Sequence, residues 1–167
     1  AGPSPISVVN AIEDRLEYES YSGPASMEVV ESGKAIDLRA KEAVAGLINA
    51  SPDEVLLTAN TTEGLNVVMT GLPWRQGDEI ITCDLEHPSI LAPSYHLQRR
   101  GVKIRVLSVA PDESHESILA KIKEALTDRT RMVFFSHIEY SCGLRMPVEQ
   151  IRDLTRQRDI WMLLDGA

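Results

Sequence analysis

Three short stretches place side chains suited to ligand or proton chemistry directly after apolar runs: Thr61 and Thr62, then His87, then Asp165. Hydroxyls that lead into a helix favour an anion site, because first-turn amides and the positive helix end attract negative charge. An imidazole can stack on a flat ring or move a proton. A carboxylate at the end of an apolar run is typical of a ligand contact. Together the three stretches favour a shared ligand site.

Each of these residues also has a simpler interpretation. A threonine at a helix start is a common cap, a histidine in a loop is usually solvated, and a strand-end acid can be a salt-bridge partner. Cys83 and His87 do not predict a metal site, because structural zinc needs about four ligands. What favours a shared site is the recurrence of such residues after successive runs.

The apolar runs themselves predict strands that alternate with helices. Near-continuous apolar strands are typical of a parallel sheet with helices on both faces, so we expect an α/β fold with right-handed crossovers. In such sheets ligands bind at the carboxyl ends of the strands. Five strands are expected, at residues 54–59, 78–83, 102–109, 130–138 and 160–165.

The chain before Pro52 has a different pattern. Two helical segments are expected there, with a break at Gly23-Pro24. We therefore predict a helical N-terminal segment at 1–50 and part of a large ligand-binding domain at 51–167.

Composition excludes several classes of protein. The 167 residues include 17 basic and 25 acidic side chains, a formal net charge of −8, which argues against a nucleic-acid partner. No run approaches the ~20 apolar residues that a membrane helix needs. Two cysteines without a CxxC pair favour a reducing, cytoplasmic location.

Several motifs carry a family resemblance. AGPSP, LTANTTEGLN, GDEIITCDLEHPSIL, FFSHIEYSCGLRMPVEQI and MLLDGA follow one another along nearly the whole chain. In order and spacing they resemble the class V aminotransferase family of pyridoxal-phosphate enzymes, which includes cysteine desulfurases, cysteine C–S lyases and isopenicillin N epimerase-like proteins. The resemblance implies the large domain of a fold type I transferase, an amino-acid substrate, Schiff-base chemistry and a homodimer.

The resemblance also implies roles for single residues. Thr61 and Thr62 match the turn that holds the cofactor phosphate, and His87 matches the histidine that stacks on the pyridine ring and is the candidate catalytic residue. Asp165 matches the aspartate that pairs with the pyridinium nitrogen, keeping it protonated so that the ring accepts electrons. Tyr140 stands where many relatives have an asparagine near the cofactor's phenolic oxygen.

Other features of the family do not match. The lysine of the Schiff base lies further along in relatives, and the small domain, with its substrate-binding arginine, follows it. The chain is therefore expected to be part of a longer enzyme and inactive alone, catalysing desulfuration, C–S lysis, transamination or epimerisation only when intact. The alternative is a fragment that binds cofactor or serves a structural role without activity. A dinucleotide-binding Rossmann domain is disfavoured, because the first turn reads ANTTEG rather than GxGxxG.

Overall fold

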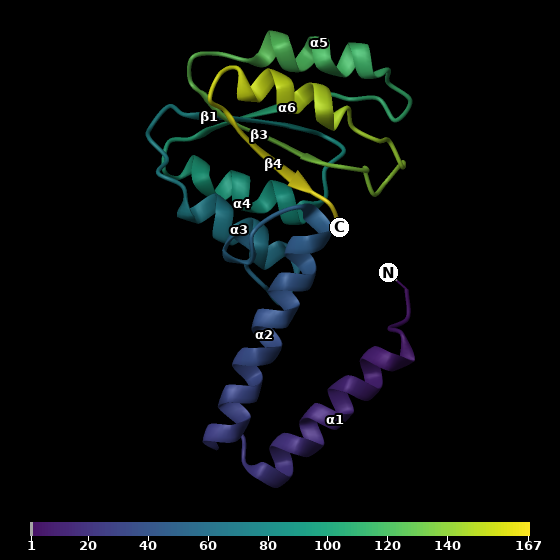
Figure 1. Cartoon of the computed structure of the whole chain (residues 1–167). Helices are drawn as coiled ribbons and strands as arrows, with labels where there is room; N and C mark the ends of the chain where they lie inside the picture. Colours follow the sequence, from purple (N-terminus) through teal and green to yellow (C-terminus); the bar gives the residue numbers. More distant parts are fainter. Residues whose placement is uncertain (1) are drawn as a thin grey trace. The chain divides into compact units, whose positions relative to one another are not determined.

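The computed structural model describes residues 2–167, apart from the side chain of Ile90. Ala1, the first residue of the predicted helical segment, lies outside the described residues. The chain forms two compact units, Ala1–Leu57 and Thr58–Ala167 (Figure 1). The predicted division into domains at residues 50 and 51 stays a prediction.

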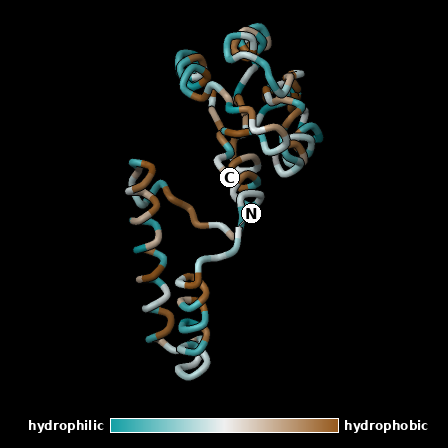
Figure 2. The backbone as a smooth tube through the Cα atoms, turned by 90° about the vertical axis from the view of Figure 1, so that its right-hand side faces the viewer, coloured by the Kyte–Doolittle hydropathy of each residue, from teal (hydrophilic) through white to brown (hydrophobic). Residues whose placement is uncertain are grey.

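The first unit consists of α1 (Ile6–Ser22), α2 (Met27–Ile48) and the 3-10 helix η1 (Pro52–Glu54). Gly23 ends α1 with a positive φ of 83°, and the Ser26 hydroxyl caps α2 by accepting a hydrogen bond from the Val29 amide. Hydrophobic and hydrophilic residues interleave along both helices (Figure 2). Among the described residues, no helix has the length and hydrophobicity needed to cross a membrane.

The second unit is an α/β structure, as predicted. Its sheet has the order β2-β1-β3-β4 and every neighbouring pair is parallel. In Figure 1, α5 and α6 lie on one side of this sheet and α3 and α4 on the other. The strands are β1 (Glu79–Cys83), β2 (Lys103–Leu107), β3 (Thr130–Ser136) and β4 (Trp161–Asp165), and the helices are α3 (Thr61–Gly71), α4 (Pro88–Gln98), α5 (His115–Ala125) and α6 (Val148–Arg156).

The middle residues of the central strands are apolar because successive side chains enter different cores. Phe134 belongs to the core formed with α3 and α4, whereas its neighbour Phe135 belongs to the core formed with α5 and α6. Ile80 and Ile81 of β1 divide between the two cores in the same way. The two cores hold the ends of β1 and β3 in fixed positions.

The edge strands are less buried than the sequence predicted. Most of β2 is exposed, and Val106 retains 41% of its accessible surface. Arg105 of β2 instead reaches across to Glu79 of β1, with nitrogen–oxygen distances of 2.9 and 3.3 Å. An edge strand has a neighbour on only one side, which explains the difference.

The strand predicted at residues 54–59 is not formed, so the prediction of five strands was wrong for the described residues. Glu54 belongs to η1, where its carboxylate accepts a hydrogen bond from the Ser51 amide. Leu56 in the following segment is 64% exposed. A strand requires backbone pairing with a neighbour, and no described strand pairs with this segment. Hydrophobicity alone therefore did not decide its structure.

Candidate functional site

A pocket of about 380 Å³ lies where the carboxyl ends of β3 and β4 meet the first turns of α3 and α4. It contains all five residues that the sequence singled out for cofactor binding. Because these residues lie up to about a hundred positions apart in the sequence, from Thr61 to Asp165, only the fold brings them together. The pocket is lined by Asn60, Thr61, Thr62, His87, Ser89, Ser136, Ile138, Tyr140, Asp165 and Ala167.

The first turn of α3 supplies one end of the pocket. Asn60 caps the helix, with its side-chain oxygen 2.9 Å from the Glu63 amide. Because Asn60 is the cap, the hydroxyls of Thr61 and Thr62 are not used for capping. Their amides are also in the first turn, where a helix provides no acceptor of its own. This end therefore presents donors and the positive end of a helix dipole to an anion.

His87 precedes α4 and is held by Ser89. Its Nδ1 lies 2.8 Å from the Ser89 hydroxyl and accepts a hydrogen bond of 3.2 Å from the Ser89 amide. A nitrogen that accepts carries no proton, so the neutral ring carries its proton on Nε2. Ser89 was missed by the sequence analysis, although a serine two residues after a histidine cap is a recognisable local pattern.

Tyr140 lies in the turn after β3 and contacts His87. The two rings meet edge to face, with centroids 5.0 Å apart and planes at 80°. The turn is closed by a bridge between Ile138 and Arg145 and by Gly143, whose φ is 73°. The tyrosine predicted near the cofactor thus forms a pocket wall together with the histidine.

Asp165 is the last residue of β4 and retains only 9% of its accessible surface. Its backbone carbonyl accepts a hydrogen bond from the His137 amide, and its Oδ1 accepts one from the Ala167 amide at 3.0 Å. It pairs in register with Ser136 of β3, another residue of the pocket. The carboxylate is therefore fixed at the buried side of the pocket.

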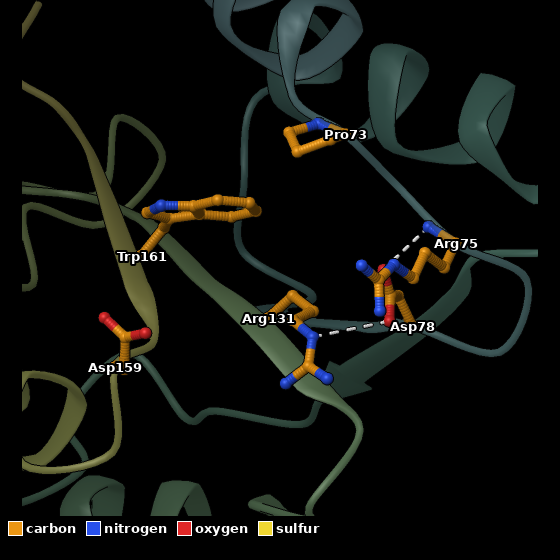
Figure 3. Close-up of a pocket in the computed structure, with 6 residues that line it drawn as sticks. All are labelled: Pro73, Arg75, Asp78, Arg131, Asp159 and Trp161. Carbon is orange, nitrogen blue, oxygen red and sulfur yellow. Dashed lines mark hydrogen bonds and ion pairs between the residues drawn. The ribbon is translucent and has the colours of Figure 1, made fainter.

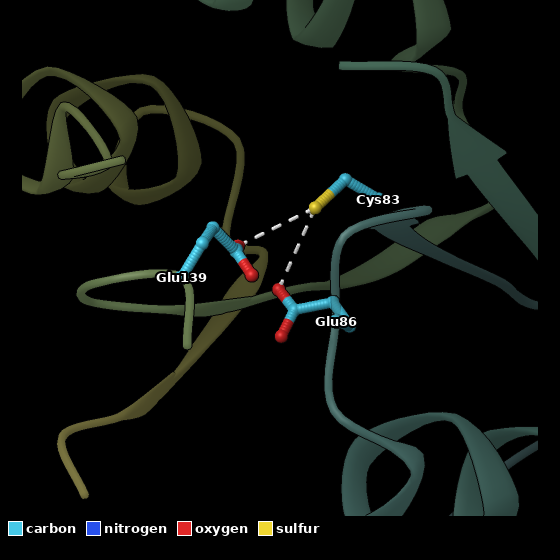
Figure 4. Close-up of side chains that lie close together, drawn as sticks. All are labelled: Cys83, Glu86 and Glu139. Carbon is cyan, nitrogen blue, oxygen red and sulfur yellow. Dashed lines mark hydrogen bonds between the residues drawn. The ribbon is translucent and has the colours of Figure 1, made fainter. Parts of the chain in front are cut away.

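Behind the pocket lies a buried cluster of Cys83, Glu86 and Glu139, whose side chains point toward one another (Figure 4). The Cys83 sulfur is 3.8 Å from Glu86 Oε1 and 3.5 Å from Glu139 Oε1. Both oxygens of Glu86 accept hydrogen bonds from Ser136, from its amide at 2.9 Å and its hydroxyl at 2.7 Å. No local pattern in the sequence indicates this cluster, because its members are up to 56 residues apart.

Burial is the main influence on the protonation of this cluster. It raises the pKa of Glu86 against the opposing effect of the Ser136 hydrogen bonds. Burial and the nearby Glu86 charge raise the pKa of Glu139 to about 7. Burial, followed by the two carboxylates, also raises the pKa of the Cys83 thiol far above its ordinary value. Burial therefore favours the protonated, uncharged form of all three side chains.

A second hollow, of about 250 Å³, lies near the starts of β1, β3 and β4 (Figure 3). Two of its charged groups form an ion pair, with Arg131 3.5 Å from Asp78, and Asp78 also accepts a hydrogen bond from the Arg75 amide. None of the predicted site residues lines it. The pocket at the carboxyl ends of β3 and β4 is the better candidate.

Comparisons with known proteins agree on one family. The family model described as aminotransferase class-V matches residues 2–167. A probable cysteine desulfurase of Methanothermobacter thermautotrophicus is 34% identical over 166 residues, which are 99% of this chain and 41% of that protein. A probable cysteine desulfurase of Pseudomonas aeruginosa is 38% identical over 132 residues, 77% of this chain and 32% of that protein.

Solved structures give the same result. The cystine C–S lyase C-DES, in complex with its product cysteine persulfide, has a TM-score of 0.90 at 29% identity, covering 97% of this chain and 44% of that one. A mutant of C-DES with glycine covalently linked to its PLP cofactor has a TM-score of 0.89 at 29% identity, covering 97% and 43%. The chain thus spans about two fifths of the length of these C-DES structures and of the Methanothermobacter relative.

Proposed function

Since the chain belongs to the class V aminotransferase family, we propose that it is part of the large domain of a pyridoxal-phosphate enzyme that acts on an amino acid. Cysteine desulfuration or C–S lysis is the reaction that its relatives' names favour. The observation that carries the proposal is the gathering of Thr61, Thr62, His87, Tyr140 and Asp165 around one pocket.

The donors of the pocket fit this cofactor. Thr61 and Thr62, at the start of α3, suit the phosphate, because amides, hydroxyls and helix dipole all favour an anion. His87 offers a ring face for stacking, and Tyr140 can donate a hydrogen bond to the phenolic oxygen. Asp165 offers a buried carboxylate for the pyridine nitrogen. Bound there, pyridoxal phosphate supplies an electron sink for the substrate's Cα.

The protein's own groups then have separate tasks. Asp165 holds a proton at the pyridine nitrogen, because an ionised carboxylate stabilises the protonated form. His87 stacks on the ring and moves a proton through Nε2, since Nδ1 is engaged by Ser89. The hydrogen bonds from Ser136 to Glu86 join the end of β3 to the loop after β1, beside the carboxylate of Asp165.

The lysine that binds the cofactor covalently comes, in this proposal, from another part of the intact protein. Lys121, for example, donates hydrogen bonds to the Ser108 carbonyl and to the Glu113 carboxylate. No lysine is among the described residues that line the pocket. We therefore propose that the 167 residues are inactive alone. We further propose that the intact enzyme is a cytoplasmic homodimer, the location being supported by two free cysteines.

The test is covalent capture of the cofactor. The full-length protein is incubated with pyridoxal phosphate, reduced with borohydride and weighed by mass spectrometry, with the 167-residue chain as the control. One reduced cofactor on the full-length protein and none on the short chain is expected. Absence of the adduct from the full-length protein contradicts the proposal.

The reaction is identified separately, with cysteine and cystine as substrates. Desulfuration releases alanine, whereas C–S lysis by β-elimination releases pyruvate and ammonia. Thermal unfolding in the presence of pyridoxal phosphate or NAD gives a further check, because only a ligand of the native state raises its stability. Protection by NAD instead of pyridoxal phosphate would favour a dinucleotide-binding protein.

A further inference from the structure

Two loops of the pocket share the same two-residue arrangement. Glu86-His87 follows β1 and Glu139-Tyr140 follows β3. In both pairs the glutamate is buried, at 4% and 0% exposure, and the aromatic residue is exposed. Each loop therefore directs a carboxyl group inward and a ring toward the pocket.

The two loops meet on both sides. On the pocket side the His87 and Tyr140 rings are in contact, 5.0 Å between centroids. On the buried side Glu86 and Glu139 both approach the Cys83 sulfur, as Figure 4 shows. The distance between the rings is thus linked to the distance between the carboxyls.

One oxygen of Glu139 indicates how the carboxyl groups of Glu86 and Glu139 interact. Glu139 Oε2 is buried and accepts no hydrogen bond from any described residue. A buried polar atom without a partner is costly, so such an atom needs an explanation. A proton on Glu139 provides one, because a protonated carboxyl donates a hydrogen bond, and Glu86 is an acceptor beside it.

The charges around Glu139 favour this proton. Glu86, from the loop after β1, and Asp165, at the end of β4, both act on it with negative charge. Cys83, on β1, faces it with a thiol that stays protonated. No ion pair joins Glu86 or Glu139 to a cation within the described part of the chain. Two buried carboxylates so close cannot both ionise at little cost.

We infer that Glu86 and Glu139 share one proton, and that this shared proton holds the two loops at the spacing that positions His87 and Tyr140 in the pocket. Both glutamates are positioning residues, since neither lines the pocket. The pKa of Glu139, about 7, places the loss of the proton near neutral pH. Above it, repulsion between the carboxylates loosens the contact between the rings.

The experiment uses the full-length protein without cofactor, so that its outcome is independent of the proposed function. Infrared spectroscopy follows the carbonyl stretch of protonated carboxyls as the pH rises through about 7. NMR follows the ring protons of His87, whose chemical shifts depend on the neighbouring Tyr140 ring. We expect a protonated carboxyl that titrates near neutral pH. We also expect the pH dependence of the His87 signals to show a second step at that same pH, in addition to the step that any histidine ring shows from its own protonation.

Three variants assign the effect. Glu139→Gln retains a donor to Glu86, so the ring contact persists while the infrared band and the second step disappear. Glu139→Ala removes the donor, so the His87 signals differ from wild type already at low pH. Glu124→Gln, the same change at an exposed position on α5, behaves as wild type.

Two results overturn the inference. One is the absence of a protonated carboxyl in the wild-type protein just below neutral pH. The other is a second step in the His87 signals that survives in Glu139→Gln. Both results are measured on the wild-type protein and on Glu139→Gln, so they test the inference even if Glu139→Ala does not fold.

Discussion

The rings of His87 and Tyr140 stand nearly perpendicular, at 80°, across the turns that follow β1 and β3. The contact joins a residue that precedes a helix to one in a tight turn more than fifty positions later. It forms the wall of a pocket whose other residues are hydroxyl donors at one side and a buried carboxylate at another. This arrangement suits a flat ring that carries an anionic group.

Replacing both threonines of the α3 turn, Thr61→Val with Thr62→Val, is expected to weaken pyridoxal-phosphate binding. Hydrogen bonds to a charged group contribute about 1.5–3 kcal/mol, and each ~1.4 kcal/mol is tenfold in affinity. We therefore expect the dissociation constant of the full-length protein to rise by at least about tenfold, measured by spectroscopic titration.

Thr70→Val is the matched control for the threonine change. Thr70 lies on the same helix, but its hydroxyl donates to the Asn66 carbonyl and does not line the pocket. An equal loss of affinity in this variant would mean that the helix, rather than the two hydroxyls at its start, determines binding.

Phe134→Ala is expected to destabilise the second unit by about 3–5 kcal/mol, the usual cost of removing a buried aromatic ring. Phe134 is fully buried between β3 and the helices α3 and α4. Chemical denaturation measures the change, with Val106→Ala on the exposed edge strand as the control. Similar losses from both variants would contradict the assignment of Phe134 to the core.

Glu79 is expected to make stability depend on acid pH. Burial raises its pKa, but hydrogen bonds from Arg105 and Thr127 outweigh that effect and hold the pKa below the ordinary 4.5. A carboxyl whose pKa is lowered by folding stabilises the folded state at pH values above its pKa in the unfolded state. This contribution is lost as the pH falls through its pKa in the folded state. Glu79→Gln should therefore reduce the loss of stability in acid.

Denaturation midpoints of the wild type and Glu79→Gln, taken at several pH values, measure this contribution as the difference between the two proteins. Glu124→Gln serves as the control, because Glu124 is exposed and makes no ion pair with a described residue. A difference that stays constant from neutral to acid pH would show that Glu79 has no lowered pKa.

Much of the site was predictable because it depends on local order along the chain. Apolar runs followed by His87 or Asp165 indicate where the carboxyl ends of strands lie, and in a parallel sheet those ends share one edge. Thr61 instead comes to the pocket at the start of α3, before which no strand is formed in the described residues. The structure confirms the alternation of helices and strands and brings the five predicted residues to one pocket. Their roles toward the cofactor remain a proposal.

The parts that were missed depend on contacts between distant residues. The hydrogen bonds from Ser136 to Glu86 join residues 50 positions apart, and the sequence around each gives no sign of the other. The expected strand that includes Leu56 failed for a related reason, since pairing requires a neighbour that no local pattern reveals. Similarly, the exposure of Val106 follows from the place of β2 at the edge of the sheet.

The central claim is that the pocket binds pyridoxal phosphate with Asp165 at the pyridine nitrogen. Asp165→Asn tests it most directly, because the amide oxygen can still accept the hydrogen bond from Ala167 while the negative charge is lost. We predict that the full-length variant folds and loses its activity on cysteine. It should also bind pyridoxal phosphate at least about tenfold more weakly, because hydrogen bonds to a charged group contribute about 1.5–3 kcal/mol. Unchanged affinity together with unchanged activity would contradict the claim.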